Sequence, residues 1–348
     1  MRIAVTGASG NVGTSLLQSL AADETVESVV AIARRRPATT FAKTTWVTAD
    51  VSRDDLTRHF EGVDAVVHLA WLIQPSRDES VTRATNVDGS RRVFRAVAAA
   101  GVPRLVYASS VGAYSPGPKD RRVDESWPTD GIETSFYSRH KAEVERVLDH
   151  YESDYPAISV VRLRPALIFK REAAAGIRRL FAGPLLPGLL VRPSLIPLVP
   201  RIARLRFQAV HSRDVGEAYR LATQRDVRGA FNIAAEPVLD PDELGRILGA
   251  RPVPVPARAV RTLADLTWRL RLQPSPPGWL DMALGVPLMD WSRAQRELGW
   301  TPRFSAADAL LDLFAGFREG AGMHTPPLDP QAGGPARSKE FTTGVGAR

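Results

Sequence analysis

The chain contains no cysteine, which excludes disulfide bonds, thiolate metal ligands and cysteine nucleophiles. It also lacks a long apolar run: the most apolar stretch, residues 185–200, is interrupted by proline, glycine and arginine, so it falls short of the roughly 18 apolar residues of a membrane span. No apolar signal-peptide core follows Met1. From these absences we expect a cytoplasmic protein with no membrane partner.

Lysine is rare, with only five among the 46 basic residues, so the other 41 are arginines and any single arginine is weak evidence for a site. The formal net charge of +8 could suit nucleic acid, but the basic residues are scattered and form no stripe interleaved with aromatics. We therefore expect no nucleic-acid partner. An RNA-associated protein would instead show salt-sensitive RNA binding.

What is present is an alternation of short β-branched runs with amphipathic segments up to about residue 165. The strand-like runs are 3–5, 29–32, 65–67, 105–107 and 159–161, and the helical segments are 12–22, 80–100 and 137–150. Strands that alternate with helices predict a parallel sheet covered on both faces. The predicted fold class is α/β, a doubly wound parallel sheet of the Rossmann type with a smaller C-terminal region.

The composition changes after residue 165, where leucine, proline and arginine become frequent. We predict a first domain over 1–165 and a second region over 166–322. Elements at about 207–235 are expected to return to the first domain. Residues 323–348 hold few apolar anchors and are expected to be a disordered tail.

A glycine-rich loop, Gly7-Ala8-Ser9-Gly10-Asn11-Val12-Gly13, follows the first strand and opens the first helix. In that context glycines permit a tight turn and close approach of a pyrophosphate, while the helix N-terminus supplies N–H groups to phosphate oxygens. The alternative is an ordinary strand-to-helix turn. The position directly after the first strand favours a dinucleotide site.

Tyr137 and Lys141 stand four residues apart, which places them on one face of a helix. A nearby ammonium lowers the pKa of a phenol and so prepares it for acid–base catalysis. By itself the spacing also fits a solvated helix face. Ser109 and Ser110 follow the strand 105–108 at the edge where open α/β sheets bind ligands, and a serine hydroxyl at that edge can stabilise charge on a substrate oxygen.

The glycine spacing, the Tyr-x-x-x-Lys pair and Ser109-Ser110 together resemble the extended short-chain dehydrogenase/reductases, also called the NAD-dependent epimerase/dehydratase family, over about 310 residues. The resemblance implies hydride transfer between nicotinamide and a small-molecule carbonyl or alcohol, with Tyr137 as acid/base. It also implies further site residues: Ser110 as the catalytic serine, Asn86 as a catalytic asparagine, Asp50 and Val51 at adenine, Leu69 and Ala70 along the cofactor, and Lys141 at the nicotinamide ribose. The pattern departs from the family at Trp71, where a small residue is usual.

Cofactor choice is expected to depend on the end of the second strand, where Arg34 and Arg35 stand and no acid occurs between Glu27 and Asp50. An acid there would bind the adenine ribose of NAD, whereas guanidinium groups suit the 2′-phosphate of NADP. We predict NADP, with NAD as the alternative.

The substrate is expected to be more apolar than a nucleotide sugar, because the segment 180–196 is leucine-rich and the Gly-Asp-Gly turn common in nucleotide-sugar members is missing. A nucleotide-sugar epimerase and a non-catalytic NAD(P)-binding regulator remain alternatives. His68, His140 and His211 show no paired ligand spacing, so no metal site is predicted. The resemblance also implies a possible homodimer through helices near 80–100 and 137–150.

Overall fold

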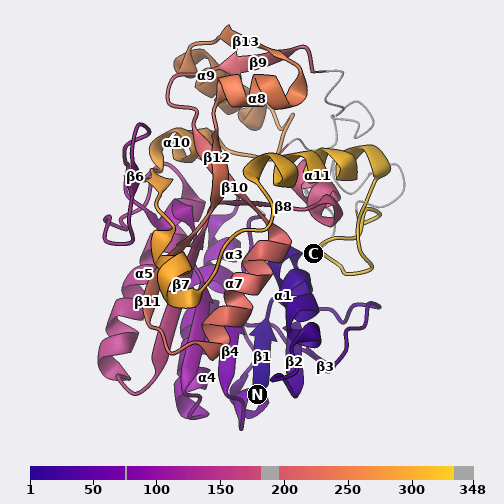
Figure 1. The fold of residues 1–348 in the computed structure, drawn as a ribbon, viewed down its shortest axis with the longest axis vertical. Helices are drawn as coiled ribbons and strands as arrows, with labels where there is room; N and C mark the ends of the chain where they lie inside the picture. The colour runs from indigo at the N-terminus through magenta and orange to yellow at the C-terminus, as the bar shows by residue number, and fades with distance from the viewer. Residues whose placement is uncertain (75–76, 182–195, 333–348) are drawn as a thin grey trace.

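The computed structural model describes residues 1–74, 77–181 and 196–332, and its largest element is a seven-stranded sheet (Figure 1). The strand order is β11-β7-β5-β4-β1-β2-β3, and every neighbouring pair is parallel. The strands are β1 (Arg2–Thr6), β2 (Ser28–Ala33), β3 (Thr44–Thr48), β4 (Ala65–His68), β5 (Arg104–Ala108), β7 (Ser159–Pro165) and β11 (Gly229–Ile233). The predicted doubly wound α/β fold is confirmed.

Helices cover both faces of this sheet because its inner strands are apolar on both sides. Ile3 and Val5 of β1 pack in one core with helices on one face, while Ala4 between them packs in a second core on the other face. The first core includes α1 (Asn11–Ala22) and α7 (Ser212–Gln224). The second face carries α2 (Thr57–Phe60), α4 (Gly89–Ala99) and α5 (Phe136–Asp154), with α3 (Glu79–Arg83) and the π-helical η1 (Ala84–Asp88) leading into α4.

Most of the remaining elements form a smaller region above the main sheet in Figure 1, but residues 111–113 pack on α5 and residues 294–298 pack on α7 and β11. Its three-stranded sheet has the order β12-β10-β8, and two further pairs are β13 with β9 and β14 with β6. The strands are β6 (Arg122–Val123), β8 (Leu167–Phe169), β9 (Leu198–Arg201), β10 (Phe207–His211), β12 (Ala235–Leu239), β13 (Arg251–Pro254) and β14 (Leu288–Met289). The helices are α6 (Ala174–Phe181), α8 (Pro241–Leu248), α9 (Ala257–Arg269), α10 (Gly278–Gly285) and α11 (Ala306–Glu319), with short turns η2 (Val111–Ala113), η3 (Arg171–Ala173) and η6 (Ala294–Leu298).

The segment 207–235 divides between the two regions. Helix α7 packs so closely on α1 that a Cβ on Gly216 would lie 2.7 Å from the Ser15 carbonyl carbon, and β11 extends the main sheet next to β7. Strand β10, in contrast, pairs with β8 and β12 in the smaller sheet. The return of this segment to the first domain therefore begins at α7, because β10 finds its hydrogen-bonding partners elsewhere.

The end of the described chain is packed rather than loose. Thr325 and Leu328 are 1% and 3% exposed, and the Ala38 N–H donates to the His324 carbonyl oxygen at 3.2 Å. Disorder from residue 323 onward was therefore a wrong expectation for residues 323–332, since Leu328 provides the apolar anchor. Residues 333–348 and most of the leucine-rich segment 180–196 lie outside the described residues. Within the described ranges, each helix is too short or too polar to cross a bilayer.

Candidate active site

Three loops meet at the carboxyl edge of the main sheet. They follow β1, β4 and β5, which are neighbours in the sheet, and they comprise residues 7–10, 69–72 and 109–113. The expected cofactor residues of the first two loops and the expected catalytic serine of the third are thus brought together. Open α/β sheets bind ligands at this edge.

The glycines of the first loop leave no room for a side chain. Gly7 has a φ of +70°, and a Cβ there would lie 2.6 Å from the Ala70 nitrogen. A Cβ on Gly13 would lie 2.5 Å from the Ala8 carbonyl oxygen. The chain therefore keeps bare backbone at the turn, as a loop that cradles a pyrophosphate requires.

The first turn of α1 has the free groups that such a ligand needs. Its N-cap, Gly10, supplies no side-chain acceptor to the first N–H groups of the helix. The side-chain Nδ2 of Asn11 donates to the Ile168 carbonyl oxygen at 3.3 Å, while its Oδ1 is buried with no partner in the described part of the chain. Ser9 and Val12 flank these groups in the same turn. Because unpaired N–H groups and the helix dipole attract anions, this turn fits a dinucleotide phosphate.

Lys170 lies beneath that turn, and the sequence analysis missed it. Its ammonium donates to the Asn11 carbonyl oxygen at 2.8 Å, to Thr14 Oγ1 at 2.7 Å and to Ser15 Oγ at 3.1 Å. Burial lowers the pKa of Lys170 to about 8, so the amine still carries most of its charge at neutral pH. It adds positive charge next to the phosphate end of the site. Only the fold brings β8 beside α1, so no local pattern signalled this contact.

The residues expected at the adenosine follow β2 and β3, the next strands along the same sheet edge. Arg34 and Arg35 are exposed just after β2, and Val51 is buried. The Asp50 carboxylate accepts from the Ser52 N–H at 3.0 Å and from its hydroxyl at 2.7 Å. Burial raises the pKa of Asp50, but these hydrogen bonds and the charge of Arg34 outweigh it, so the net pKa is lowered. Asp50 is therefore an anion that already faces Arg34.

Tyr137 is the second residue of α5, whose N-cap Ser135 accepts from the Ser138 N–H at 3.4 Å. Ser110 caps η2 across from it, where its hydroxyl accepts from the Gly112 N–H at 3.0 Å. Burial raises the pKa of Tyr137, and the hydrogen bond with Ser110 opposes this only in part. The phenol is therefore a protonated donor next to the Ser110 hydroxyl.

Lys141 lies one turn further along α5, and its amine is engaged away from the phenol. It donates to the Ala108 carbonyl oxygen at 2.6 Å and lies 3.4 Å from the centre of the Trp71 indole, against 5.8 Å from the centre of the Tyr137 ring. Burial holds the pKa of Lys141 well below its ordinary value. The sequence predicted that this ammonium lowers the Tyr137 pKa, but in this arrangement burial raises it instead.

Asn86 occupies the π-helical turn η1 and is fully buried. Its Oδ1 accepts from the Leu72 N–H and its Nδ2 donates to the Leu72 carbonyl oxygen, both at 2.7 Å. The amide therefore fixes the loop that carries Trp71. In this arrangement Asn86 orients a wall of the site, and its hydrogen-bonding groups are directed at that loop.

Glu145 continues the face of Lys141 by one more turn and was not singled out from sequence. Its carboxylate accepts from Arg164 at 2.8 and 3.0 Å, from Arg162 at 2.9 Å and from the Ser109 hydroxyl at 2.5 Å. Burial alone would raise the pKa of the Glu145 carboxyl, but the two arginines have the larger, opposite effect and lower the pKa to about 2. This ion cluster ties α5 to β5 and β7 directly behind the site. The spacing of four from Lys141 was the signal that could have found it.

The histidines act as structural groups in the described residues. His68 binds Thr6 Oγ1 at 2.7 Å and Ser90 Oγ at 3.0 Å through its two ring nitrogens, and burial with the charge of Lys141 lowers its pKa to about 3. His140 meets a Glu79 carboxylate oxygen at 3.2 Å. The described ranges contain no cluster of three or more side chains that could hold a metal ion.

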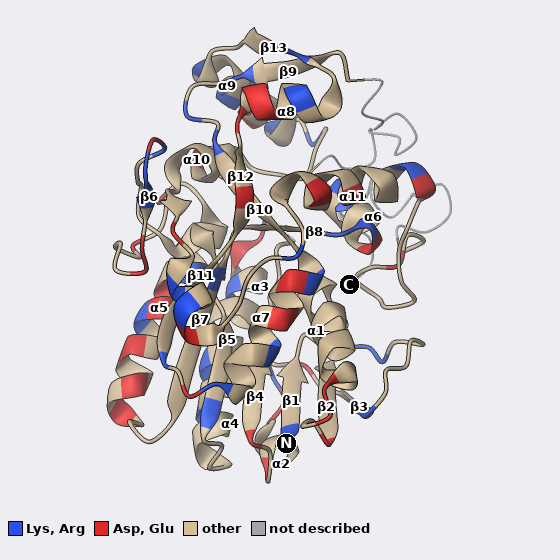
Figure 2. Cartoon of the chain, in the orientation of Figure 1, with Lys and Arg blue, Asp and Glu red and all other residues tan. Residues whose placement is uncertain are grey.

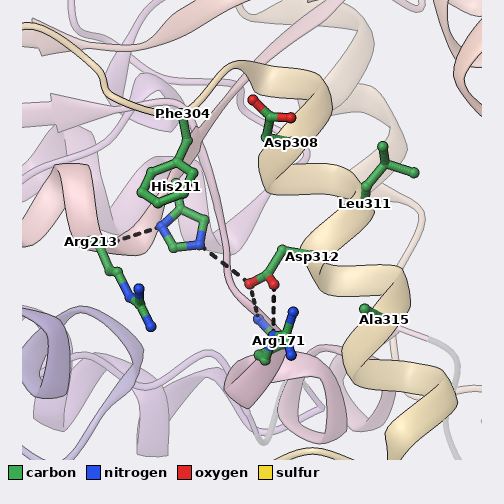
Figure 3. Close-up of a pocket in the computed structure, with 8 residues that line it drawn as sticks. All are labelled: Arg171, His211, Arg213, Phe304, Asp308, Leu311, Asp312 and Ala315. Atoms are coloured by element: carbon green, nitrogen blue, oxygen red, sulfur yellow. Dashed lines mark hydrogen bonds and ion pairs between the residues drawn. The ribbon is translucent and has the colours of Figure 1, made fainter.

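A separate hollow of about 730 Å³ opens between β10 and α11 (Figure 3). Asp312 accepts there from the Arg171 N–H and Nε, both at 2.8 Å, and meets His211 Nε2 at 3.3 Å. The other ring nitrogen of His211 accepts from the Arg213 N–H at 3.2 Å. Both ring nitrogens are thus satisfied, so this network joins α11 to β10 and shares no residue with the surroundings of Tyr137.

The helices expected at a homodimer interface present charged groups. Figure 2 shows acidic and basic residues along α5, and the ion pairs on this face include Arg83 with Glu143 at 2.6 Å and Arg91 with Glu143 at 3.2 Å. Arg92 and Arg95 are also exposed on α4. A second copy that docked here would have to match each charge, because burying unpaired ions costs free energy.

Comparison with known proteins assigns the chain a family. The family model for the NAD dependent epimerase/dehydratase family matches residues 3–234. An uncharacterised protein of Mycobacterium tuberculosis is 28% identical over 327 residues, which are 93% of this chain and 31% of that protein. This chain therefore spans about a third of the length of that relative.

Solved structures agree with the fold. The protein gox2253 superposes with a TM-score of 0.69 at 23% identity, over 92% of this chain and 99% of that one. A UDP-glucose-4-epimerase from Stenotrophomonas maltophila, with bound NAD and formylated UDP-arabinopyranose, has a TM-score of 0.67 at 22% identity, over 92% and 98% of the two chains. At such identities the likeness establishes the fold alone.

Proposed function

The chain belongs to the NAD-dependent epimerase/dehydratase family, and we propose that it transfers a hydride between a nicotinamide cofactor and a carbonyl or alcohol carbon, with Tyr137 as acid and base. The observation that carries the proposal is the meeting of two features at one sheet edge. These are the glycine-rich loop around Gly7 and the α5 face that presents Tyr137 beside Ser110. The loop would bind the phosphates of the cofactor, and Tyr137 on α5 would transfer the proton. A dehydrogenase step needs both functions at one place.

The cofactor would lie along the carboxyl edge of the sheet. Its pyrophosphate would meet the loop and first turn of α1, its adenosine would meet Asp50 and Val51, and its nicotinamide half would pass Leu69 and Ala70. The residues proposed at the phosphates are Gly7, Ser9, Gly10, Asn11, Val12 and Gly13. When bound, the nicotinamide supplies or accepts the hydride.

Tyr137 would handle the proton that accompanies the hydride. In reduction the phenol gives its proton to the carbonyl oxygen as the carbon takes the hydride, so a ketone becomes an alcohol. In oxidation the phenolate takes the alcohol proton. Ser110 would hold the same oxygen, and the Lys141 ammonium would stabilise the phenolate once it turns from Ala108 toward the site.

For the cofactor we propose a preference for NADP(H). Arg34 and Arg35 are exposed at the end of β2, where a 2′-phosphate would lie, and Arg34 is close enough to Asp50 to lower its pKa. A guanidinium binds phosphate through paired, charge-assisted hydrogen bonds. The alternative is NAD, whose adenine ribose would meet the same side chains without that charge match.

We propose that residues 1–165, with α7 and β11, form the cofactor domain and that the other elements of 166–322 close over the substrate. A nucleotide-sugar epimerase is a second candidate, favoured by the UDP-sugar in the Stenotrophomonas neighbour. A non-catalytic NAD(P)-binding regulator is a third, which the intact pair of Tyr137 and Lys141 disfavours.

The test is a turnover screen with NADPH and NADH against ketones, alcohols and nucleotide sugars, run in parallel with Tyr137→Phe. We expect the variant to bind cofactor and to lose roughly 10²–10⁴-fold in turnover, because only the proton-carrying hydroxyl is removed. Equal turnover by both proteins would contradict the role of Tyr137. Cofactor binding without turnover on any compound would favour the regulator.

A further inference from the structure

Aromatic side chains from three distant parts of the chain surround Tyr137. The Trp279 ring lies 5.1 Å from the Tyr137 ring at 37°, and the Trp71 ring lies 5.9 Å from it at 74°. Phe181 at the end of α6 meets Trp279 edge-on at 5.2 Å. The phenol ring is therefore in contact with two indoles, and Phe136 and Phe181 in turn contact Trp279.

These walls are held in place by close backbone packing. Helix α10, which carries Trp279, packs at Gly278 directly against the Thr134 carbonyl group, where no Cβ would fit. On the other side, a Cβ on Gly112 would lie 2.9 Å from Tyr137 Cε1 and 3.1 Å from Met282 Sδ. Because each approach requires glycine, α10 has little freedom to move away from the phenol.

The two indoles also offer unused hydrogen-bond donors. The Nε1 atoms of Trp71 and Trp279 are buried, and within the described ranges neither has an acceptor. A buried donor without a partner costs free energy that a ligand oxygen recovers. The walls beside Tyr137 therefore suit a molecule that is flat and apolar but carries oxygen atoms at its edge.

Arg261, which lies beside α10, is already paired with an acid, which weighs against its use by a diphosphate. It forms two hydrogen bonds with Asp281 of α10, at 2.8 and 3.0 Å. Arg204 donates to the Leu284 carbonyl oxygen at 3.2 Å, and Arg206 donates to the Lys119 carbonyl oxygen at 2.6 Å, so both help to hold the backbone near α10. A nucleotide diphosphate would have to break the Arg261–Asp281 ion pair to use that charge.

We propose that the substrate is an uncharged, flat-ring ketone or alcohol, aromatic or conjugated, that stacks on Trp279 and is bounded by Trp71. This inference rests on the proposed function and names the substrate class of the same site. In the reductive direction the ring ketone carbon takes the hydride of the reduced cofactor and its oxygen takes the Tyr137 proton, which yields the ring alcohol and oxidised cofactor. The indole N–H groups bind the remaining oxygens of the ring.

The experiment compares 1-tetralone, a flat bicyclic ketone, with 2-octanone and UDP-glucose in NADPH- and NADH-linked turnover and in thermal shifts of the cofactor-loaded enzyme. We expect turnover and stabilisation to be strongest with 1-tetralone. In Trp279→Ala the KM for 1-tetralone should rise about tenfold or more with kcat changed less, since a stacking face is lost. Trp279→Phe should restore most of the affinity.

The matched control is Trp127→Phe, because Trp127 contacts Arg121 and the Ser115 carbonyl oxygen and has no ring contact with Tyr137 in the described residues. It should leave both constants unchanged. Stronger binding or turnover of UDP-glucose, no response to 1-tetralone, or an unchanged KM in Trp279→Ala would each overturn the substrate class. A different result would contradict the hydride-transfer proposal itself: no compound would be turned over, or Tyr137→Phe would turn over substrate as fast as wild type.

Discussion

The Lys141 ammonium lies 3.4 Å from the centre of the Trp71 indole and donates a hydrogen bond to the Ala108 carbonyl oxygen. A cation over an indole face is stabilised by roughly 0.5–2 kcal/mol, so this contact holds the amine away from Tyr137. The family resemblance implies that this lysine binds the nicotinamide ribose. If that expectation holds for this chain, cofactor binding pulls Lys141 from the indole.

We therefore predict that cofactor binding changes tryptophan fluorescence mainly through Trp71. Titration of wild type with NADPH or NADH should shift or quench the emission, and Trp71→Phe should abolish most of that change while cofactor still binds by calorimetry. Trp127→Phe serves as the comparison and should keep the response. If Trp71→Phe responded as wild type does, Lys141 would not leave the indole on binding.

The pH dependence should differ between the two directions of the reaction. Burial raises the pKa of Tyr137 above its ordinary value of 10.0 while Lys141 stays at Trp71, and a Lys141 that turned toward the phenol on cofactor binding would lower it. Without cofactor the phenol is therefore protonated at neutral pH. Reduction uses the protonated form, so kcat/KM for reduction should be flat around neutral pH. Oxidation uses the phenolate and should accelerate about tenfold per pH unit until the pKa is reached. A fall of the reductive rate near neutral pH that Tyr137 titration explains would contradict this.

Arg34→Ala should weaken NADPH binding and leave NADH binding nearly unchanged, because the proposed role of its guanidinium is to contact only the additional phosphate. Hydrogen bonds to charged groups are worth about 1.5–3 kcal/mol, which corresponds to roughly tenfold to a hundredfold in Kd. Arg36→Ala, an exposed arginine of the same loop, is the control and should have little effect. Equal losses for both cofactors in Arg34→Ala, or tighter NADH binding by wild type, would refute the preference.

Glu145→Gln should destabilise the fold by about 3–5 kcal/mol at neutral pH, because it leaves the buried Arg164 without its carboxylate partner, while Arg162 keeps Asp149 and Glu152. Glu143→Gln removes a partly exposed partner of Arg83 and should cost about 0–1 kcal/mol. Chemical denaturation of both variants measures the difference. A cost for Glu145→Gln no larger than that of Glu143→Gln would show that the buried cluster adds little.

The pH dependence of that effect has a fixed sign. The folded pKa of Glu145, about 2, is lower than its ordinary 4.5, so the carboxylate stabilises the fold above the ordinary value. That stabilisation is lost as pH falls from about 4.5 toward 2. The stability gap between wild type and Glu145→Gln should shrink over this window and not at alkaline pH.

Much of the fold could be predicted because its signals are local. The apolar runs at 3–5 and 65–67 must be covered on both sides, so alternation with helices already implies a parallel sheet. Parallel strands all end at one edge, which is why Gly7, Ser110 and Tyr137 could be expected near one another. The exceptions are informative: β10 lies outside the main sheet, and residues 323–332 are packed, because long-range pairing and a single buried Leu328 decide them.

By itself the sequence determined the doubly wound sheet, the glycine loop and the shared face of Tyr137 and Lys141, since each depends on spacing within one or two elements. The tertiary structure alone decided which side chains surround those groups. Lys170 contacts Thr14 in the first turn of α1, although the two residues are 156 positions apart in the sequence. Trp279 contacts Tyr137 from another helix. Such contacts depend on how whole elements pack. Packing also buries Tyr137, and this burial, rather than the charge of Lys141, has the largest effect on the pKa of its phenol.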